Sequence, residues 1–387
     1  MFAKVRPVGS QVPKPEPGES LSLPWAAHYT TLFTGSGTEA LSLAVQAAIA
    51  DKAGVAVPEV VIPAYGCPDL VAAIVAQNAR PVLVDFVKDN PVMDEQCIVG
   101  ALTSQTVAIV GVEFLGSHER LLMLSRLCSD KGLTLIEDSA QCFPPASSDH
   151  QLADYVVLSF GRGKPINLMG GGALLIRKSN ESVVQAIRAK YPCSAVQLDA
   201  IWHIKRRIFN LLLSRYVYPI LERIPFLHIG QTRFHPLDSI TLLDLPGSLL
   251  TAGMKMYNER KPLHWRYDRE LGFLEQAGWK QIKTDKTEGF APRLRYALLA
   301  PTCQIRDEAL KALNVKGIGA NAFYEHTLPA FVEENASING EGLRNRYPAA
   351  EDFAARLITL PTHDDVVEKD ISTIVSVFER FKVSQVV

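Results

Sequence analysis

Residues 133–141 read LTLIEDSAQ, an apolar run that ends in two acidic residues. On both sides of it, short β-branched runs alternate with segments of helical periodicity. Nearly continuous apolar strands in such an alternation are typical of a mostly parallel sheet covered by helices on both faces. Ligands of these sheets bind beyond the carboxyl ends of the strands, so the sequence predicts that Asp138 points into a ligand crevice. The alternative is that Glu137 and Asp138 only cap the next helix.

The alternation predicts an α/β fold with the following elements. Strands are expected at Glu59–Ile62, Pro81–Val84, Val107–Val112, Leu133–Ile136, Tyr155–Phe160 and Ala173–Ile176, and helices at Glu39–Ala50, Leu70–Gln77 and Glu119–Lys131. A long amphipathic stretch, Leu249–Gln276, is expected to join two domains. The second domain is expected to contain a strand at Arg295–Leu299, a helix at Arg306–Leu313, a loop at Glu333–Gly342 and a terminal helix at Glu368–Lys382.

The length of 387 residues also predicts two domains, because single cores rarely exceed roughly 250–300 residues. We expect a mobile arm at residues 1–20, rich in Pro, Glu and Gly, with folded structure beginning near Leu21. A large domain is then expected at residues 21–250 and a smaller carboxyl-terminal α/β domain at residues 251–387. With 47% hydrophobic and 21% charged residues, the chain can build a sizeable core.

Charge and cysteine content exclude several classes of protein. The 40 basic residues nearly balance the 41 acidic ones, which leaves a net charge of −1 and no global field that would attract nucleic acid. The six cysteines form no C-x-x-C pair, which argues against a zinc ribbon or a dithiol redox motif. We find neither a signal-peptide pattern nor an apolar run of the roughly 18–20 residues that span a membrane. These features favour a cytoplasmic protein without a metal site.

Two further motifs carry chemistry. Residues 34–41, TGSGTEAL, place glycines and hydroxyls before a helix, where free N–H groups can bind a phosphate; the alternative is an ordinary cap and turn. Residues 159–165, SFGRGKP, offer Lys164 on a glycine-rich loop that is followed by a glycine triplet at residues 170–172. Such a lysine is a candidate amine nucleophile, and the alternative is an ordinary surface lysine.

The order of these motifs is more specific than each motif alone. Further matching pieces are Ile62-Pro63-Ala64-Tyr65, Val82-Leu83-Val84-Asp85, residues 346–351 and Leu360-Pro361-Thr362-His363. Over roughly residues 21–380 the chain resembles the DegT/StrS family of pyridoxal-phosphate-dependent sugar aminotransferases. The resemblance implies a fold-type-I transferase with pyridoxal 5'-phosphate as cofactor.

The resemblance also implies a role for particular residues. Lys164 would form the covalent link to the cofactor aldehyde, and Asp138 would bond the pyridinium nitrogen and keep it protonated. Gln141 would lie near the cofactor hydroxyl, and Gly37, Thr38 and Ser159 would hold the phosphate. The implied reaction moves an amino group, from glutamate, to a keto group of a sugar-like acceptor. Alternatives are a regulatory protein that binds the cofactor without catalysis and a sugar dehydratase, although dehydratases of this family carry histidine in place of the lysine.

Departures from the family pattern leave three positions open. Arg162-Gly163 precedes the lysine where relatives have Pro-Thr or a similar pair. Cys67 stands where relatives place an aromatic residue over the cofactor ring, so either Cys67 covers the ring or Tyr65 or another aromatic residue does. The resemblance implies a homodimer with shared active sites, in which residues 230–233 reach the neighbouring phosphate; Arg233 is the candidate, or else a solvated surface charge.

Residues 201–223 form an unusual block in which apolar residues are interleaved with Lys205, Arg206, Arg207, Arg215 and Arg223. The block is too charged to span a membrane. The sequence favours an amphipathic helix that packs on a neighbouring subunit or roofs the acceptor pocket, because the overall charge offers no attraction to a membrane and Pro219 interrupts the helix. A peripheral membrane contact is the alternative.

Overall fold

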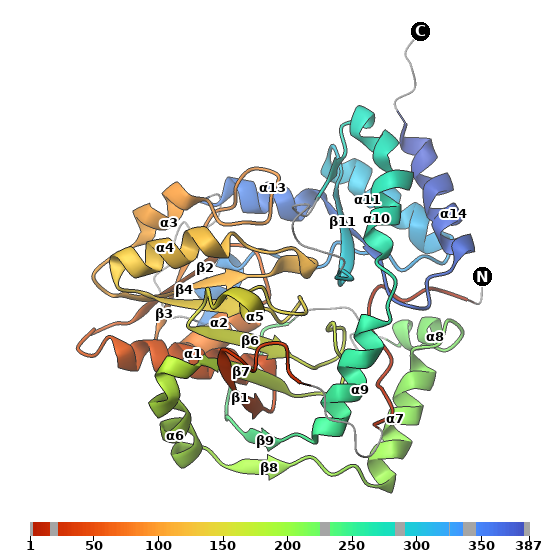
Figure 1. The fold of residues 1–387 in the computed structure, drawn as a ribbon. Helices are drawn as coiled ribbons and strands as arrows, with labels where there is room; N and C mark the ends of the chain where they lie inside the picture. Colours follow the sequence, from red (N-terminus) through yellow and green to blue (C-terminus); the bar gives the residue numbers. More distant parts are fainter. Residues whose placement is uncertain are drawn as a thin grey trace.

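The structure is a computed structural model that describes residues 3–15, 22–224, 233–282, 291–324, 326–335 and 346–382. Its main body is a nine-stranded sheet in the order β3-β2-β4-β5-β6-β7-β1-β9-β8 (Figure 1). The strands are β1 (Tyr29–Thr34), β2 (Glu59–Pro63), β3 (Arg80–Val84), β4 (Thr106–Val112), β5 (Thr134–Asp138), β6 (Tyr155–Ser159), β7 (Gly172–Arg177), β8 (Cys193–Ala195) and β9 (Leu242–Asp244).

The sheet confirms the predicted α/β fold and all six predicted strands. Strands β3, β2, β4, β5 and β6 run parallel, whereas β7 is antiparallel to both β6 and β1. Every residue of β2 and β4 is buried, which explains why their sequences are apolar without alternation. Strand β1 was not predicted, because its threonine-rich sequence is only half-buried and its antiparallel partners lie far away in the sequence.

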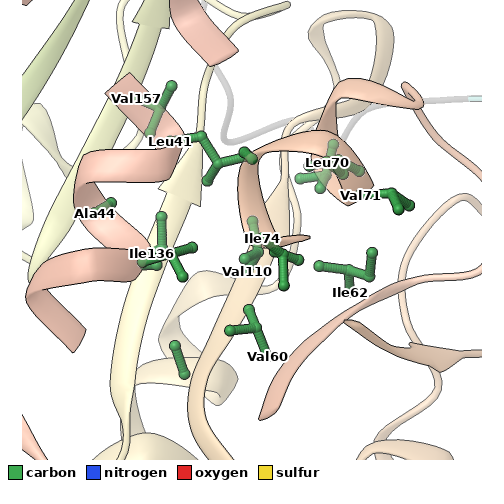
Figure 2. Close-up of a cluster of buried hydrophobic side chains, with 14 of the residues drawn as sticks. Leu41, Ala44, Val60, Ile62, Leu70, Val71, Ile74, Val110, Ile136 and Val157 are labelled. Atoms are coloured by element: carbon green, nitrogen blue, oxygen red, sulfur yellow. The ribbon is translucent and has the colours of Figure 1, made fainter. Parts of the chain in front are cut away.

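Helices cover both faces of this sheet. They are α1 (Gly37–Asp51), α2 (Asp69–Val75), α3 (Glu95–Ala101), α4 (Leu121–Lys131), α5 (Ser147–His150), α6 (Glu181–Lys190), α7 (Ala200–Leu212), α8 (Tyr218–Glu222) and α9 (Gly247–Asn258). Val60 and Ile62 of β2 pack against α1 and α2 (Figure 2), whereas Val61 between them joins the core on the opposite face. This period of two divides the large body into two cores.

A smaller unit follows, with an antiparallel sheet in the order β10-β11-β12. Its elements are β10 (Lys280–Gln281), β11 (Arg295–Leu299), β12 (Leu357–Pro361), α10 (Leu263–Glu270), α11 (Cys303–Val315), α12 (Pro329–Asn335), α13 (Pro348–Arg356) and α14 (Glu368–Phe378). A separate core, which includes Trp279, Tyr296 and Phe378, holds this unit together.

The stretch Leu249–Gln276, which was expected to join the two domains, is divided into separate helices. Helix α9 ends at Asn258, and α10 begins only after Pro262, which lacks the N–H that a continuing helix needs. Met254 and Tyr257 of α9 belong to the core of the large sheet. Their packing favours a division between the units after α9 instead of at residue 250.

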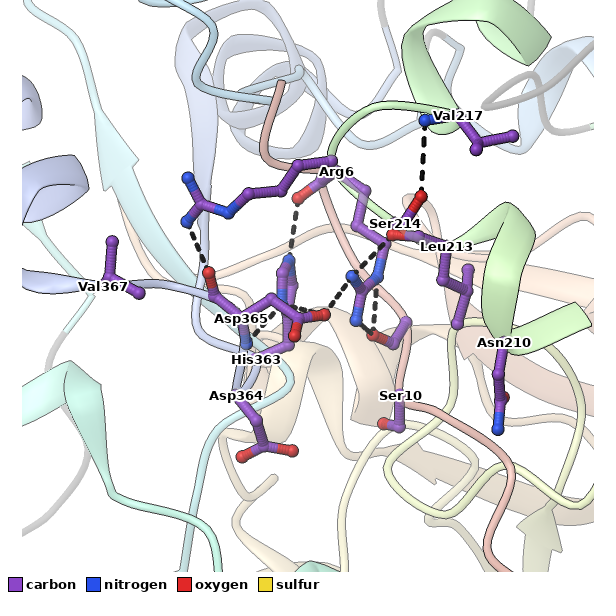
Figure 3. Close-up of polar contacts among 12 residues, drawn as sticks. Arg6, Ser10, Asn210, Leu213, Ser214, Val217, His363, Asp364, Asp365 and Val367 are labelled. Atoms are coloured by element: carbon purple, nitrogen blue, oxygen red, sulfur yellow. Dashed lines mark hydrogen bonds and ion pairs between the residues drawn. The ribbon is translucent and has the colours of Figure 1, made fainter. Parts of the chain in front are cut away.

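The beginning of the chain also differs from the expected mobile arm. Residues 3–15 are packed against the rest of the protein: Val5 forms a bridge with Ile318, and Val5, Arg6 and Val12 are buried. Arg6 pairs with Asp365 and donates a hydrogen bond to the carbonyl of Leu213 at 2.9 Å (Figure 3). The sequence did not predict these contacts, because a proline-rich segment has no helix or strand pattern and its partners are distant in the sequence. Residues 16–21 lie outside the described part of the chain.

None of the helices in the described ranges combines the length and hydropathy needed to cross a membrane.

The packing of residues 3–15 predicts the effect of Gly319→Ala. A Cβ at Gly319 would lie 2.7 Å from the backbone nitrogen of Pro7 and closer still to the carbonyl oxygen of Val5. We expect the substitution to lower the free energy of unfolding by about 1–3 kcal/mol and to make residues 3–15 more susceptible to protease. Urea titration and limited proteolysis would measure both. Gly247→Ala is the control, because a Cβ there meets no atom within 4 Å; equal effects of the two substitutions would contradict the proposed packing.

Candidate active site

One wall of the site is a close contact between α1 and the sheet. A Cβ on Gly37, the first residue of α1, would lie only 2.8 Å from the Cβ of Ser159 at the end of β6. A Cβ on Gly172, at the start of β7, would lie 2.6 Å from the backbone nitrogen of Gly37. The glycines therefore let the amino end of α1 approach β6 and β7. This brings two predicted phosphate-binding residues, Gly37 and Ser159, together beside a positive helix end.

The amino end of α1 is also capped. The Ser36 hydroxyl oxygen accepts a hydrogen bond from the N–H of Glu39 at 3.1 Å, and the Glu39 carboxylate accepts one from the N–H of Thr241 at 2.8 Å. The Thr38 hydroxyl donates to Asp69 at the start of α2, over 3.1 Å. The motif therefore caps the helix, and it also places Gly37 beside Ser159, as the predicted phosphate site requires.

Lys164 lies on a loop whose backbone requires glycine. Gly163 and Gly171 have φ values of +73° and +88°, in the left-handed region that residues with a Cβ rarely adopt. Lys164 is half-buried between them, and its N–H donates to the carbonyl of Gly161 at 3.4 Å. The guanidinium of Arg162 lies over the ring of Phe209 in α7, 5.6 Å from its centroid. The unusual arginine before the lysine therefore links the loop to α7.

Asp138 and Glu137 at the end of β5 have different surroundings. The Glu137 carboxylate accepts hydrogen bonds from the N–H groups of Ala146 at 2.7 Å and Ser147 at 3.0 Å, so it caps α5. Asp138 is buried, and among the described residues it accepts a hydrogen bond only from the N–H of Ala140, at 3.0 Å. Burial raises the pKa of Asp138, while that N–H and the charge of Lys164 act in the opposite direction. The capping alternative thus holds for Glu137 but not for Asp138.

Cys67 lies close to Asp69 and Lys164. It is half-buried, and its surroundings raise the thiol pKa to about 12, first through burial and then through the charge of Asp69. Lys164 lowers this pKa in part, so the lysine acts electrostatically on both Cys67 and Asp138. Cys67 is therefore a neutral thiol at physiological pH. Asp69 was not predicted as a site residue, because an acid in the first turn of a helix is normally an ordinary dipole contact.

The other residue that sequence analysis missed is Tyr324. Its hydroxyl accepts a hydrogen bond from Nε2 of Gln141 at 3.0 Å and is hydrogen-bonded to Cys67. Oε1 of Gln141 accepts the N–H of Leu115 at 3.0 Å, so both ends of the amide are fixed. Tyr324 belongs to the smaller unit and stands 160 positions after Lys164, and no local signal marks it.

Tyr65 was the aromatic alternative to Cys67 for covering the cofactor ring, but its side chain is used in other contacts. It is fully buried among other aromatic side chains, including Phe114 and Phe353. Its hydroxyl donates to the carbonyl of Tyr324 at 3.1 Å and accepts the N–H of the same residue at 3.2 Å. Tyr65 therefore holds Tyr324 in position, and Cys67 and Tyr324 remain the candidates for the ring.

The structure brings together Gly37, Thr38, Cys67, Asp138, Gln141, Ser159 and Lys164 at the carboxyl ends of the parallel strands. Arg233 is exposed in this chain, and residues 230–232 of the proposed phosphate-binding segment lie outside the described residues. A buried carboxylate, an amine and a helix end at one edge of the sheet can hold a cationic ring and a phosphate and can transfer a proton.

Known sugar aminotransferases resemble this chain in sequence. The dTDP-4-dehydro-2,3,6-trideoxy-D-glucose 4-aminotransferase of Saccharopolyspora spinosa is 25% identical over 366 residues, which cover 90% of this chain and 83% of the relative. A shorter match, 28% over 156 residues, covers 40% of this chain and 42% of the UDP-2-acetamido-2-deoxy-3-oxo-D-glucuronate aminotransferase of Pseudomonas aeruginosa.

Solved structures and a family model agree with these matches. The PLP form of Spr1654 from Streptococcus pneumoniae, described as a sugar aminotransferase, superposes with a TM-score of 0.66 at 18% identity and covers 97% of this chain and 98% of its own. Bacillus subtilis NtdA with bound PMP gives 0.67 at 16% identity, over 92% of this chain and 74% of its own. These likenesses show the fold. The family model matches residues 26–206 and 249–379, and the chain therefore belongs to the DegT/DnrJ/EryC1/StrS aminotransferase family.

Proposed function

We propose that this chain moves an amino group from glutamate to a keto group of a sugar linked to a nucleotide. The family is that of pyridoxal-phosphate-dependent sugar aminotransferases, so pyridoxal 5'-phosphate is the cofactor. The observation that carries the proposal is that the charge of Lys164 acts on the buried Asp138, at the strand ends where Gly37 contacts Ser159. The nucleotide-linked acceptor is supported by relatives named for dTDP-linked and UDP-linked sugars.

The residues present fit this cofactor in three ways. Asp138 offers a buried carboxylate whose Oδ2 has no hydrogen-bond donor among the described residues, as the partner of a cationic ring nitrogen would. The glycine contact between Gly37 and Ser159 leaves a helix end for the phosphate. Lys164 supplies the amine. When bound, the cofactor supplies an electron sink for the bonds around the substrate nitrogen.

Asp138, Lys164 and Gln141 have separate roles in the proposed reaction. Asp138 holds the proton on the ring nitrogen, because a carboxylate at this position stabilises the positive charge in a buried site. Lys164 moves the proton at the substrate carbon, and its half-buried position on a glycine-rich loop leaves part of the side chain accessible for this step. Gln141, fixed by Tyr324 and Leu115, orients the ring edge through its amide.

Lys164 also separates the proposed reaction from its alternatives. Dehydratases of the family carry histidine at this position, so a lysine favours transamination. Retention of both Lys164 and Asp138 argues against a purely regulatory protein. A half-reaction with glutamate, followed through the absorption of the cofactor, would distinguish amino transfer from binding alone. Pyridoxamine-loaded enzyme can then be screened against nucleotide-linked, lipid-linked and free keto sugars.

The first functional prediction concerns Lys164. Borohydride reduction of the loaded protein should attach the cofactor to the peptide that contains Lys164, as mapped by mass spectrometry. Lys164→Ala should slow the glutamate half-reaction about 10³-fold or more. Lys164→Arg should be no better, because a guanidinium stays protonated and supplies no neutral amine. Attachment to another lysine, or unchanged turnover in Lys164→Ala, would refute the assignment.

The second prediction concerns Tyr324. In Tyr324→Phe, Gln141 loses its acceptor, so we expect cofactor affinity to fall about fivefold, the equivalent of one hydrogen bond of about 1 kcal/mol. Equilibrium dialysis and the absorption band of the bound cofactor would report the change. Tyr155→Phe is the control, because that hydroxyl donates to Asp51, over 3.3 Å, and Tyr155 begins β6 whereas Ser159 ends it. Equal affinities for the two variants would show that Tyr324 does not act on the site.

The third prediction concerns a homodimer with shared sites, which fold-type-I enzymes generally form. We propose that residues 230–233 of one subunit complete the phosphate site of its neighbour, with Arg233 as the binding group. Inactive Lys164→Ala mixed with inactive Arg233→Ala should regain activity, because one of the two hybrid sites is intact. Subunit exchange must be shown separately with differently tagged chains. Exchange without any recovery would count against Arg233 as the shared residue.

A further inference from the structure

Helix α7 has one face that packs against the protein. Asn210 donates from Nδ2 to the carbonyl of Val12 at 3.0 Å and accepts the Val12 N–H at 2.8 Å. Arg206 donates to the same carbonyl at 3.2 Å. In Figure 1 the chain before residue 16 runs between α7 and α9, which places α7 at the periphery. The inner face of α7 is thus covered by residues of the same chain.

The outer face of α7 is apolar and exposed. Ile201, Ile204, Ile208 and Leu211 recur at helical spacing along one stripe and are 61%, 55%, 52% and 61% exposed. Tyr216 and Ile220 continue the apolar surface through α8. Six of the twelve large apolar side chains that are exposed in the described ranges therefore lie within residues 201–220. Such a concentration marks an interaction surface.

Basic residues border this stripe on both sides. At about 100° per residue, Lys205 lies along one edge of the stripe and Arg207 along the other. Both are exposed, and neither forms an ion pair with a described residue. Residues 200–221 contain no Asp or Glu, so the field of the whole face is positive although the chain carries a net charge of −1. Arg206 lies on the inner side of α7, where it donates to the Val12 carbonyl, and the charge of Arg215 is balanced by Asp370.

The apolar surface continues inward beside the candidate active site. A cavity of about 540 Å³ lies beside α7 and is lined by Trp202, Ile208 and Phe209 together with Gly170 and Gly171 of the lysine loop. Arg162 and Lys205 supply the charged groups of its wall. The outer face of α7 is therefore adjacent to the loop that carries Lys164.

We propose that the outer face of α7, with the start of α8, lies on an anionic phospholipid bilayer. An apolar stripe bordered by basic residues is the pattern of a helix that lies in the plane of the membrane interface. Its apolar side chains enter the acyl boundary, and Lys205 and Arg207 reach the anionic headgroups. Pro219 does not oppose this arrangement, because it occupies the first turn of α8, where proline is tolerated.

A second copy of this chain fits the face less well. In a two-fold symmetric contact between two α7 helices, the basic borders of one copy would face those of the other. No acidic residue within 200–221 is present to neutralise them. The segment at residues 207–248 also lies between the two parts that match the family model, so most of this face does not belong to the shared family pattern.

Sedimentation with vesicles tests the proposal on the full chain and needs no catalytic activity. We expect the protein to sediment with vesicles of phosphatidylcholine and phosphatidylglycerol, weakly with phosphatidylcholine alone, and less at high salt. Lys205→Gln with Arg207→Gln should weaken binding about fivefold for each charge removed. Ile204→Ser with Leu211→Ser should abolish it, while the glutamate half-reaction of these variants is retained, because neither pair touches the lysine or Asp138.

A matched control pair of an apolar and a basic residue lies in the smaller unit, far from α7 in the sequence. Val315, 69% exposed on α11, is followed by the exposed Lys316, and Val315→Ser with Lys316→Gln should leave vesicle binding unchanged. The proposal is overturned if the wild-type chain sediments with neither vesicle, or if this control loses binding to the same extent. Sedimentation velocity without lipid tests the other occupant. If Ile204→Ser with Leu211→Ser converts a dimer to a monomer, the outer face of α7 is a contact between subunits and the proposal is overturned.

Discussion

The site depends on a backbone contact that only glycine permits. The amino end of α1 touches the carboxyl end of β6 and the start of β7, and a Cβ on Gly172 would come within 2.5 Å of the carbonyl carbon of Ser36. Because the contact leaves no room for side chains, the amino end of α1 lies directly beside Ser159. Moving α1 outward by the width of a methyl group would separate this helix end from Ser159.

Burial sets the pKa values of the ionisable groups in the candidate site. Asp138 and Cys67 both lose solvent, which raises the pKa of each, and the Lys164 charge offsets part of this effect. A carboxylate, a thiol and an amine in one small space therefore influence each other more strongly than they would in water. Tyr324 reaches this space from the smaller unit, so the relative position of the two units also sets the geometry of Gln141.

Residues 3–15 connect parts of the protein that are distant in sequence. They contact Ile318 of the smaller unit, Asn210 of α7 and, through the carbonyl of Ser10, Asn167 of the lysine loop at 2.8 Å. The same segment thus supports the inner face of α7 and the loop that carries the amine. The inner face of α7 is thus linked to the lysine loop through this segment and through the stacking of Arg162 on Phe209.

The sequence by itself determined the α/β class and the six central strands, and it supplied the candidate site residues, because apolar runs and the short motifs around Gly37, Asp138 and Lys164 are local patterns. Tertiary structure alone decided the roles of Tyr324 and Asp69, the cap formed by Glu137, and the packing of residues 3–15. Tyr324, Asp69 and residues 3–15 contact residues that are distant in the sequence. The cap depends on which of two adjacent acids, Glu137 or Asp138, faces α5. Periodicity and spacing report the chain's local preferences, whereas burial and distance between remote segments exist only in the folded chain.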